Sequence, residues 1–225
     1  MHIPDGFIDI PTASAAAVIS VGSVAVALRK SRQVLDEAVA PMAGLAAVFI
    51  FAAQMMNFPV AAGTSGHLIG GALAAILIGP WAAMLAMTVV VSTQALIFAD
   101  GGLTALGLNL LNMAVVPTLL GWLLFRGLLK VLPRTHVADM AAVAVAAFIT
   151  VPVAAAMFSL EFAIGGTTSL DPVLVLKTMV GIHLLIGLGE AAITVLVISA
   201  VRATRADLIV GLADRLPKLV IKETV

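Results

Sequence analysis

The 225-residue chain contains no cysteine and no tyrosine, and charged residues make up only 11% of it. Without cysteine the chain has no disulfide, no thiolate metal ligand and no thiol nucleophile. Its formal net charge is zero, which disfavours nucleic acid as a partner. The sequence also lacks the Gly-rich phosphate-binding pattern G-x-x-x-x-G-K-[ST]. Any ATP hydrolysis linked to this protein is therefore expected on a different polypeptide.

What the chain has instead is apolar surface, because 62% of its residues are hydrophobic and its mean hydropathy is +1.18. A soluble core of this size could not bury so much apolar surface, so the composition predicts an integral membrane protein. The apolar stretches are helix-length rather than short and alternating, which favours a helical bundle. No Lys or Arg precedes the first stretch, since the first positive charge is Arg29, and this argues against a cleavable signal peptide.

Seven apolar segments predict an all-α, polytopic bundle of about seven transmembrane helices. The third segment is short for a hydrocarbon core of about 30 Å, and Gly79-Pro80 ends it, so we expect a half-helix buried among its neighbours. We expect one membrane domain over residues 1–201 and a short cytoplasmic tail over residues 202–225. The predicted segments span residues 8–28, 39–56, 67–79, 81–99, 103–125, 137–158 and 173–201.

The distribution of charge predicts the orientation of the chain in the membrane. Basic residues follow the first and seventh segments and lie between the fifth and sixth, whereas acidic residues dominate the opposite loops. By the positive-inside rule, the amino terminus is expected outside and the carboxyl terminus inside.

The amino terminus itself is a potential chelator. The α-amine of Met1, the amide nitrogen of His2 and the His2 imidazole can close five- and six-membered rings around one metal ion. A second imidazole, such as that of His67, could supply a fourth nitrogen, and nitrogen-rich tetragonal surroundings suit Ni(II) or Cu(II). The alternatives are an ordinary frayed terminus and a hydrogen-bonded interfacial histidine at position 67.

The loop that leads to His67 contains Gly63, Ser65 and Gly66. These small residues let a backbone leave helical geometry and approach another group closely. Irregular backbone at membrane depth is tolerated where protein or a cavity covers it. We therefore predict that this loop forms a wall of the site.

Polar side chains also occur within the apolar segments. His183 and Glu190 are seven residues apart and share one helix face, where they could line a pathway or fix helix packing. A proton relay through this pair would indicate a secondary transporter or channel, which is one alternative. A catalytic zinc held by His67 and Glu190 is another, although the sequence has no H-E-x-x-H motif. Gln54 and Gln94 are expected to face the interior of the bundle, and Asn109 and Asn112 are attributed to helix packing.

Four stretches resemble the CbiM/NikM family, the substrate-specific S components of cobalt and nickel energy-coupling factor transporters. The two specific ones are MHIPDGF at residues 1–7 and NFPV followed by GTSGHLIGG within residues 57–71. The others are QALIFADGGL running on to Asn112, and residues 183–190. Ala62 departs from the glycine that is commoner in the family.

The resemblance implies a protein that binds Co(II) or Ni(II) as its substrate and has no catalytic cofactor. It implies metal ligands from Met1, His2 and His67, with Asn57, Thr64 and Ser65 in support. Partners would be a transmembrane coupling subunit, cytoplasmic ATPases and a small accessory membrane subunit, all in the plasma membrane of a prokaryote. The sequence does not choose between cobalt and nickel.

Overall fold

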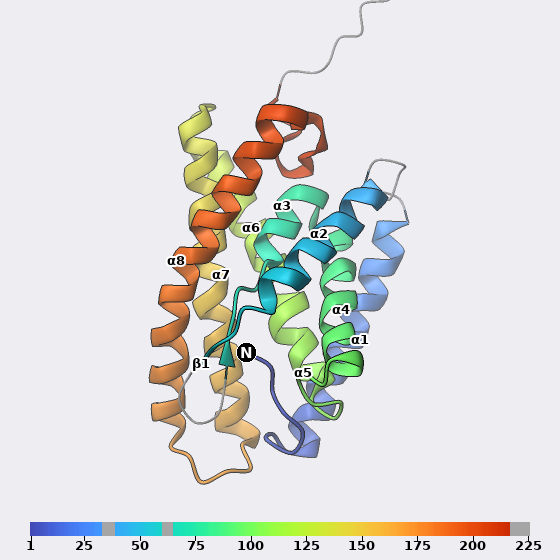
Figure 1. The fold of residues 1–225 in the computed structure, drawn as a ribbon, viewed down its shortest axis with the longest axis vertical. Coiled ribbons are helices and arrows are strands. Elements are labelled where there is room, and N and C mark those ends of the chain that lie inside the picture. Colours follow the sequence, from blue (N-terminus) through green and yellow to red (C-terminus); the bar gives the residue numbers. More distant parts are fainter. Residues whose placement is uncertain (33–38, 60–64, 217–225) are drawn as a thin grey trace, which may run out of the picture.

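The computed structural model describes residues 1–32, 39–59 and 65–216 of the chain. They form a helical bundle with a two-residue antiparallel pairing of strands β1 (Phe58–Pro59) and β2 (Ser65–Gly66). The long helices run side by side (Figure 1). The helices are α1 (Ile10–Ser31), α2 (Val39–Gln54), α3 (Gly71–Ile78), α4 (Pro80–Ile97), α5 (Leu106–Leu110), the π-helix η2 (Leu111–Val115), α6 (Val116–Val131), α7 (His136–Gly165) and α8 (Pro172–Arg205).

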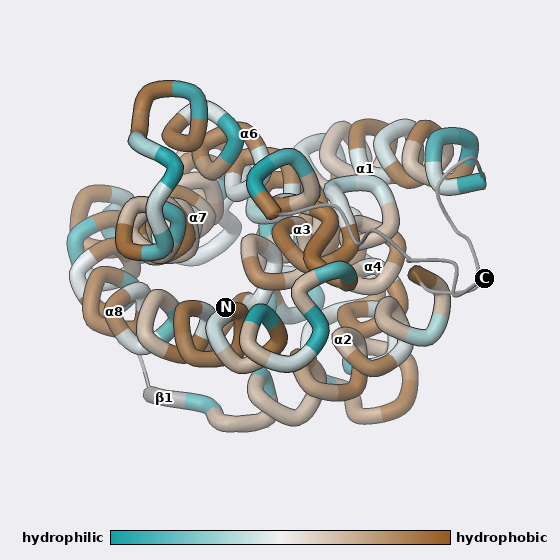
Figure 2. Tube along the Cα trace, turned by 90° about the horizontal axis from the view of Figure 1, so that it is seen from above, coloured by the Kyte–Doolittle hydropathy of each residue, from teal (hydrophilic) through white to brown (hydrophobic). Residues whose placement is uncertain are grey.

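The predicted membrane bundle is confirmed. Within the described residues, five helical stretches are long and apolar enough to cross a membrane, namely α1, α4, the continuous α5–η2–α6, α7 and α8. Helix α2 is shorter but apolar, and α3 completes the seven. Viewed from one end, the helices are mainly hydrophobic along their length (Figure 2). Which end faces the cytoplasm stays a prediction.

Side-chain caps fix where the long helices begin. The carboxylate of Asp9 accepts a hydrogen bond from the amide of Thr12 at 3.0 Å and starts α1. Asp171 does the same for the amide of Val173 at 3.0 Å, directly before Pro172. Such caps satisfy amides that have no partner inside the helix, and proline at the first position loses no bond.

Helix α3 is the predicted half-helix, and all eight of its residues are buried. It begins at Gly71 rather than at residue 67, because the left-handed backbone of Gly70 interrupts helical geometry; the amides of Ile69 and Gly70 bond a side chain from α8. Gly70 has φ +79°, which favours glycine. At the other end Gly79 has φ +80°, and the chain turns there into α4.

Glycines let α3 lie directly against the continuous helix η2–α6. A Cβ atom added to Gly71 would lie 2.5 Å from Cβ of Pro117, and one added to Gly121 would lie 2.8 Å from Ala72. Small residues permit this close approach between membrane helices. The half-helix is therefore enclosed by backbone and fixes the depth of the loop that precedes it.

A buried ion-pair cluster closes the bundle end opposite to the α7–α8 turn. Asp139 of α7 accepts from Arg202 of α8 and from Arg215 beyond it, both at 2.8 Å. After α8 the chain makes two 3-10 turns, η3 (Ala206–Leu208) and η4 (Val210–Leu212), and packs back onto α3. The division into a membrane domain and a cytoplasmic tail stays a prediction.

Candidate metal-binding site

Residues 1–9 form a strap that runs from the start of α1 into the bundle (Figure 1). Met1 and Ile3 are completely buried. The amide of Ile3 donates to Oδ1 of Asn109 at 2.7 Å, and Nδ2 of Asn109 donates back to the Ile3 carbonyl at 3.1 Å. Gly102 also donates its amide to the Ile3 carbonyl, at 2.8 Å. The inner end of the strap is thus held by helix α5 and by the loop before it.

The outer part of the strap is fixed as well. Oδ1 of Asp5 accepts from the amide of Thr104 at 2.7 Å and from its hydroxyl at 2.6 Å. The amide of Asp9 donates to the carbonyl of Gly165, at the end of α7, at 2.7 Å. The terminus is a packed segment with partners along its length, not the frayed end that was the alternative.

The loop between α4 and α5 is shaped to receive the strap. A Cβ atom on Gly101 would lie 3.2 Å from Cδ2 of His2, and one on Gly102 would lie 2.3 Å from the amide nitrogen of Asp5. Gly101 also has φ +98°, a conformation that other residues rarely adopt. The two glycines therefore leave the space that residues 2–5 fill.

The imidazole of His2 lies between two polar side chains. Its Nε2 is 3.1 Å from Oε1 of Gln94, and its Nδ1 is 3.1 Å from Oδ1 of Asp100. Gln94 uses its amide nitrogen to donate to Gln54 at 2.9 Å, so its oxygen is left to accept. Nε2 of His2 therefore carries a hydrogen, and Nδ1, which faces the Asp100 carboxylate, is the ring nitrogen at which a metal ion could replace a proton.

His67 is completely buried and stacks on His2, with ring centroids 4.8 Å apart and an angle of 26° between the rings. Its Nδ1 is 2.7 Å from the carbonyl oxygen of Leu68. A carbonyl can only accept, so Nδ1 carries the hydrogen and Nε2 keeps a lone pair. That Nε2 has no hydrogen-bond partner in the described part of the chain.

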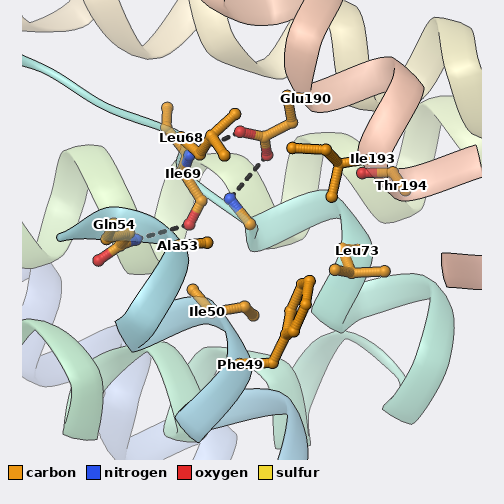
Figure 3. Close-up of a pocket in the computed structure, with 11 residues that line it drawn as sticks. Phe49, Ile50, Ala53, Gln54, Leu68, Ile69, Leu73, Glu190, Ile193 and Thr194 are labelled. Atoms are coloured by element: carbon orange, nitrogen blue, oxygen red, sulfur yellow. Dashed lines mark hydrogen bonds between the residues drawn. The ribbon is translucent and has the colours of Figure 1, made fainter. Parts of the chain in front are cut away.

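The peptide that follows His67 is held from both sides (Figure 3). The two carboxylate oxygens of Glu190 on α8 accept from the amides of Ile69 and Gly70, each at 2.6 Å. From α2, Nε2 of Gln54 donates to the carbonyl of Ile69 at 2.6 Å. Glu190 thus fixes the His67 loop, and Gln54 connects that loop through Gln94 to His2.

The electrostatics of the site favour neutral nitrogen and a nearby negative charge. Burial lowers the pKa of the Met1 amine to about 4, and Asp100 offsets only part of this effect. The hydrogen bond with His2 is the largest of several contacts that lower the pKa of Asp100, and the Asn57 side chain is another. The amine is therefore neutral near pH 7 and has a free lone pair, while the carboxylate beside it is charged.

The structure brings Met1, His2 and His67 together and connects Asn57 to them through Asp100. His183 and Glu190 lie buried on α8. Ser65 is in β2, and Thr64 lies outside the described residues. In the described part of the chain, no three His, Cys, Asp or Glu side chains cluster as metal ligands. The candidate site described above is not such a cluster, because only two of its possible donors are histidine side chains and another is the amine at the chain terminus.

Sequence reasoning missed the roles of Asp100, Gln94, Gln54 and Asn109. Asp100 counted only as a loop charge, Asn109 as a packing residue, and Gln54 and Gln94 only as polar groups expected to face the interior. The positions of the amide side chains could have been noticed in the sequence, since such groups are costly within apolar spans and tend to face the interior. The partners of these side chains could not be read from the sequence, because each side chain contacts a residue at least 15 positions away.

Fold and site together define a multi-pass membrane protein that encloses its own amino terminus beside two stacked imidazoles. Residues 2–208 match the family model described as the cobalt uptake substrate-specific transmembrane region, CbiM. The chain belongs to this family of cobalt and nickel transport proteins.

Similar proteins and structures agree with this assignment. A protein of Haloquadratum walsbyi named for metal transport is 40% identical over 211 residues, 93% of each chain. One of Archaeoglobus fulgidus named for fused nickel transport, NikMN, is 38% identical over 209 residues, 93% of this chain and 68% of that protein. The crystal structure of a transition metal transporter superposes with a TM-score of 0.85 at 27% identity, over 95% of this chain and 98% of the other.

Proposed function

We propose that this protein is the substrate-binding membrane subunit of an ATP-driven uptake system for Ni(II) or Co(II). The observation that carries the proposal is the stacking of His2 on His67, both buried, beside a buried chain amine. The two histidines are 65 positions apart in the sequence, and neither packing of apolar helices nor capping explains why they meet. Neutral imidazole and amine nitrogens are the ligands that these metals favour.

The ligands would be the Met1 amine, the amide nitrogen and Nδ1 of His2, and Nε2 of His67. The first three close adjacent chelate rings, which requires the amide to lose its proton. Nδ1 of His2 is the ring nitrogen that such a chelate uses, and Gln94 supports the tautomer that leaves it available. The ion would take the place of a proton between Nδ1 and Asp100, and the carboxylate would then balance its charge.

The strap would also serve as the gate on the outer side. Its hydrogen bonds to Asn109 and Thr104 involve side chains and a loop amide rather than bonds within a helix, so it can leave and return without unfolding a helix. Release toward the other side would require movement of helices driven by partners. We assign that work to a coupling subunit and separate ATPases in a prokaryotic plasma membrane, with a small accessory membrane subunit, because this sequence has no phosphate-binding loop.

The two alternative functions receive less support from the contacts. In a proton relay the side chains of His183 and Glu190 would need to exchange protons with neighbouring groups. Both carboxylate oxygens of Glu190 instead accept hydrogen bonds from backbone amides. The same bonds remove Glu190 from a zinc site with His67. The metal-binding role uses groups that the fold leaves available.

Equilibrium binding of Ni(II) and Co(II) to purified protein with its native terminus tests the proposal. It is compared with a variant that has two extra glycines before Met1, which moves the amine away, leaves every side chain intact and avoids placing a histidine third in the chain, where it would form a new chelate with the displaced amine. We expect binding to fall at least about 100-fold, since the five-membered ring closes through the amine, which also anchors the amide nitrogen shared by the second ring. As a matched control, a longer extension removable by a protease directly before Met1 should bind only after cleavage.

Equal binding by the native and extended proteins would refute the terminal chelator. A cellular measurement tests the ATP-driven part separately. Uptake of radioactive nickel or cobalt should require co-expression of the partner ATPase, and uptake by this chain alone would indicate a secondary transporter.

A further inference from the structure

His183 is a buried histidine that the proposed chelate does not use. It is completely buried. Its Nδ1 lies 2.7 Å from the carbonyl oxygen of Met179, four residues earlier on α8. That carbonyl can only accept, so Nδ1 carries the hydrogen and Nε2 keeps a lone pair. Nε2 makes no hydrogen bond to any described residue, which is costly for a buried polar atom unless something binds it.

The position of His183 on α8 points it to the candidate site. Helix α8 contacts β2, the strand directly before His67. Glu190, seven residues further along the same face, bonds the amides two and three residues after His67. In Figure 1 the amino terminus lies level with the half of α8 that contains residue 183.

The electrostatics agree with this placement. The Met1 amine lies close enough to interact with both His67 and His183, and His183 lies close enough to interact with His67. Three nitrogen groups from distant parts of the chain therefore share one buried region. Two of them, Nε2 of His67 and Nε2 of His183, are unpartnered atoms of the same tautomer.

We infer that Nε2 of His183 is the axial, fifth ligand of the metal ion and tunes the choice between cobalt and nickel. The inference rests on the proposed function. Four nitrogens in one plane leave the two axial directions open. Ni(II) is stable in a square plane, whereas Co(II) in such a plane commonly takes a further ligand. An axial imidazole thus stabilises the cobalt complex more than the nickel complex.

The chain offers matched variants for a test. His183→Phe keeps an aromatic ring in the space but removes the nitrogen, and His183→Ala serves as a second variant in case the larger ring disturbs packing. His136→Ala removes an exposed histidine at the far end of α7 and is the control.

The decisive measurement is electron paramagnetic resonance of the purified protein loaded with Co(II). In a low-spin planar cobalt complex the unpaired electron occupies an orbital directed at the axial ligand. One axial nitrogen-14 therefore splits each cobalt hyperfine line into a triplet, and histidine labelled with nitrogen-15 converts the triplet into a doublet. We expect the triplet in the native protein and in His136→Ala, and its loss in both His183 variants.

Binding titrations give the second readout. We expect the His183 variants to bind Co(II) about tenfold more weakly and Ni(II) within about threefold of the native protein. Native Co(II) protein without nitrogen splitting, or splitting that persists in His183→Phe, would overturn the inference while the chelate itself stands. Failure of the native protein to bind either ion would instead refute the proposed function.

Discussion

The side chain of Asn109 pairs with the main chain of Ile3 through two hydrogen bonds, as the edge of a neighbouring β-strand would. The amide accepts from the Ile3 N–H and donates to the Ile3 carbonyl. Because Ile3 directly follows His2, this pairing positions the residues of the proposed terminal chelate relative to helix α5. One side chain thus substitutes for the secondary structure that the strap lacks.

Asn109→Ala should therefore weaken metal binding. Each of the two hydrogen bonds contributes about 1 kcal/mol, so the affinity for Ni(II) should fall by up to about 30-fold, measured by titration calorimetry. Ser159→Ala is the control, because its buried hydroxyl bonds only a carbonyl of its own helix. Unchanged affinity in Asn109→Ala would show that the strap needs no such clamp.

Glu190→Gln should lower both stability and metal affinity. The glutamine side chain has one acceptor oxygen, so either Ile69 or Gly70 would lose its bond and face an N–H group instead. A buried donor without a partner costs about 1–3 kcal/mol, and the loop that holds His67 would shift. Thermal unfolding in detergent and metal titration measure the two effects.

Glu161→Gln is the matched control for that change. Glu161 is also buried, but only one of its oxygens accepts a bond, from Nδ2 of Asn112 at 2.6 Å. Glutamine keeps that acceptor, so stability and metal affinity should both stay near the native values. Equal losses in the two variants would mean that removing any buried carboxylate has the same effect.

Gly102→Ala should displace the strap by sterics alone. Its Cβ would lie 2.3 Å from the amide nitrogen of Asp5, which is too close for contact, so residues 1–5 must move. We expect at least about a tenfold loss of metal affinity with the helical circular dichroism unchanged. Gly127→Ala adds the same methyl group where nothing lies within 4 Å and should bind metal as the native protein does.

Asp139→Asn should separate stability from metal binding. It removes the charge that pairs with Arg202 and with the nearly buried Arg215, and loss of one partner from a buried ion pair costs about 3–5 kcal/mol. We expect a lower unfolding temperature and a metal affinity within about twofold of native. Asp207→Asn, at the exposed pair with Arg205, should have little effect on either.

The bundle was predictable from sequence because the length of each apolar stretch indicates a membrane helix, and glycine and proline mark where such a helix ends. The half-helix before Gly79-Pro80 was predicted for the same reason. Its start was misplaced by four residues, since the carboxylate that holds Ile69 and Gly70 comes from a helix 120 positions away. Local sequence has no information about such a partner.

The candidate site also has a part that could be predicted from sequence and a part that could not. Met1, His2 and His67 were predicted as ligands from their chemistry and from a family resemblance; the structure brings them together, and their binding of metal stays a prediction. The chain from His2 through Gln94 and Gln54 to Ile69 was not identified, because amide side chains look the same in packing and positioning roles. Only the partners of each amide, brought together by folding, distinguish the two roles.

Helix α3 has a consequence for how the protein is made. At 1.5 Å per residue its eight residues span about 12 Å, less than half of a hydrocarbon core of about 30 Å. Such a segment cannot stay in the bilayer alone, yet part of its surroundings in the bundle comes from α6, which begins at Val116, well after α3 in the chain. The nascent chain must therefore keep α3 paired with α2 or α4 until α6 arrives, so the loop that carries His67 is among the last parts to reach its final place.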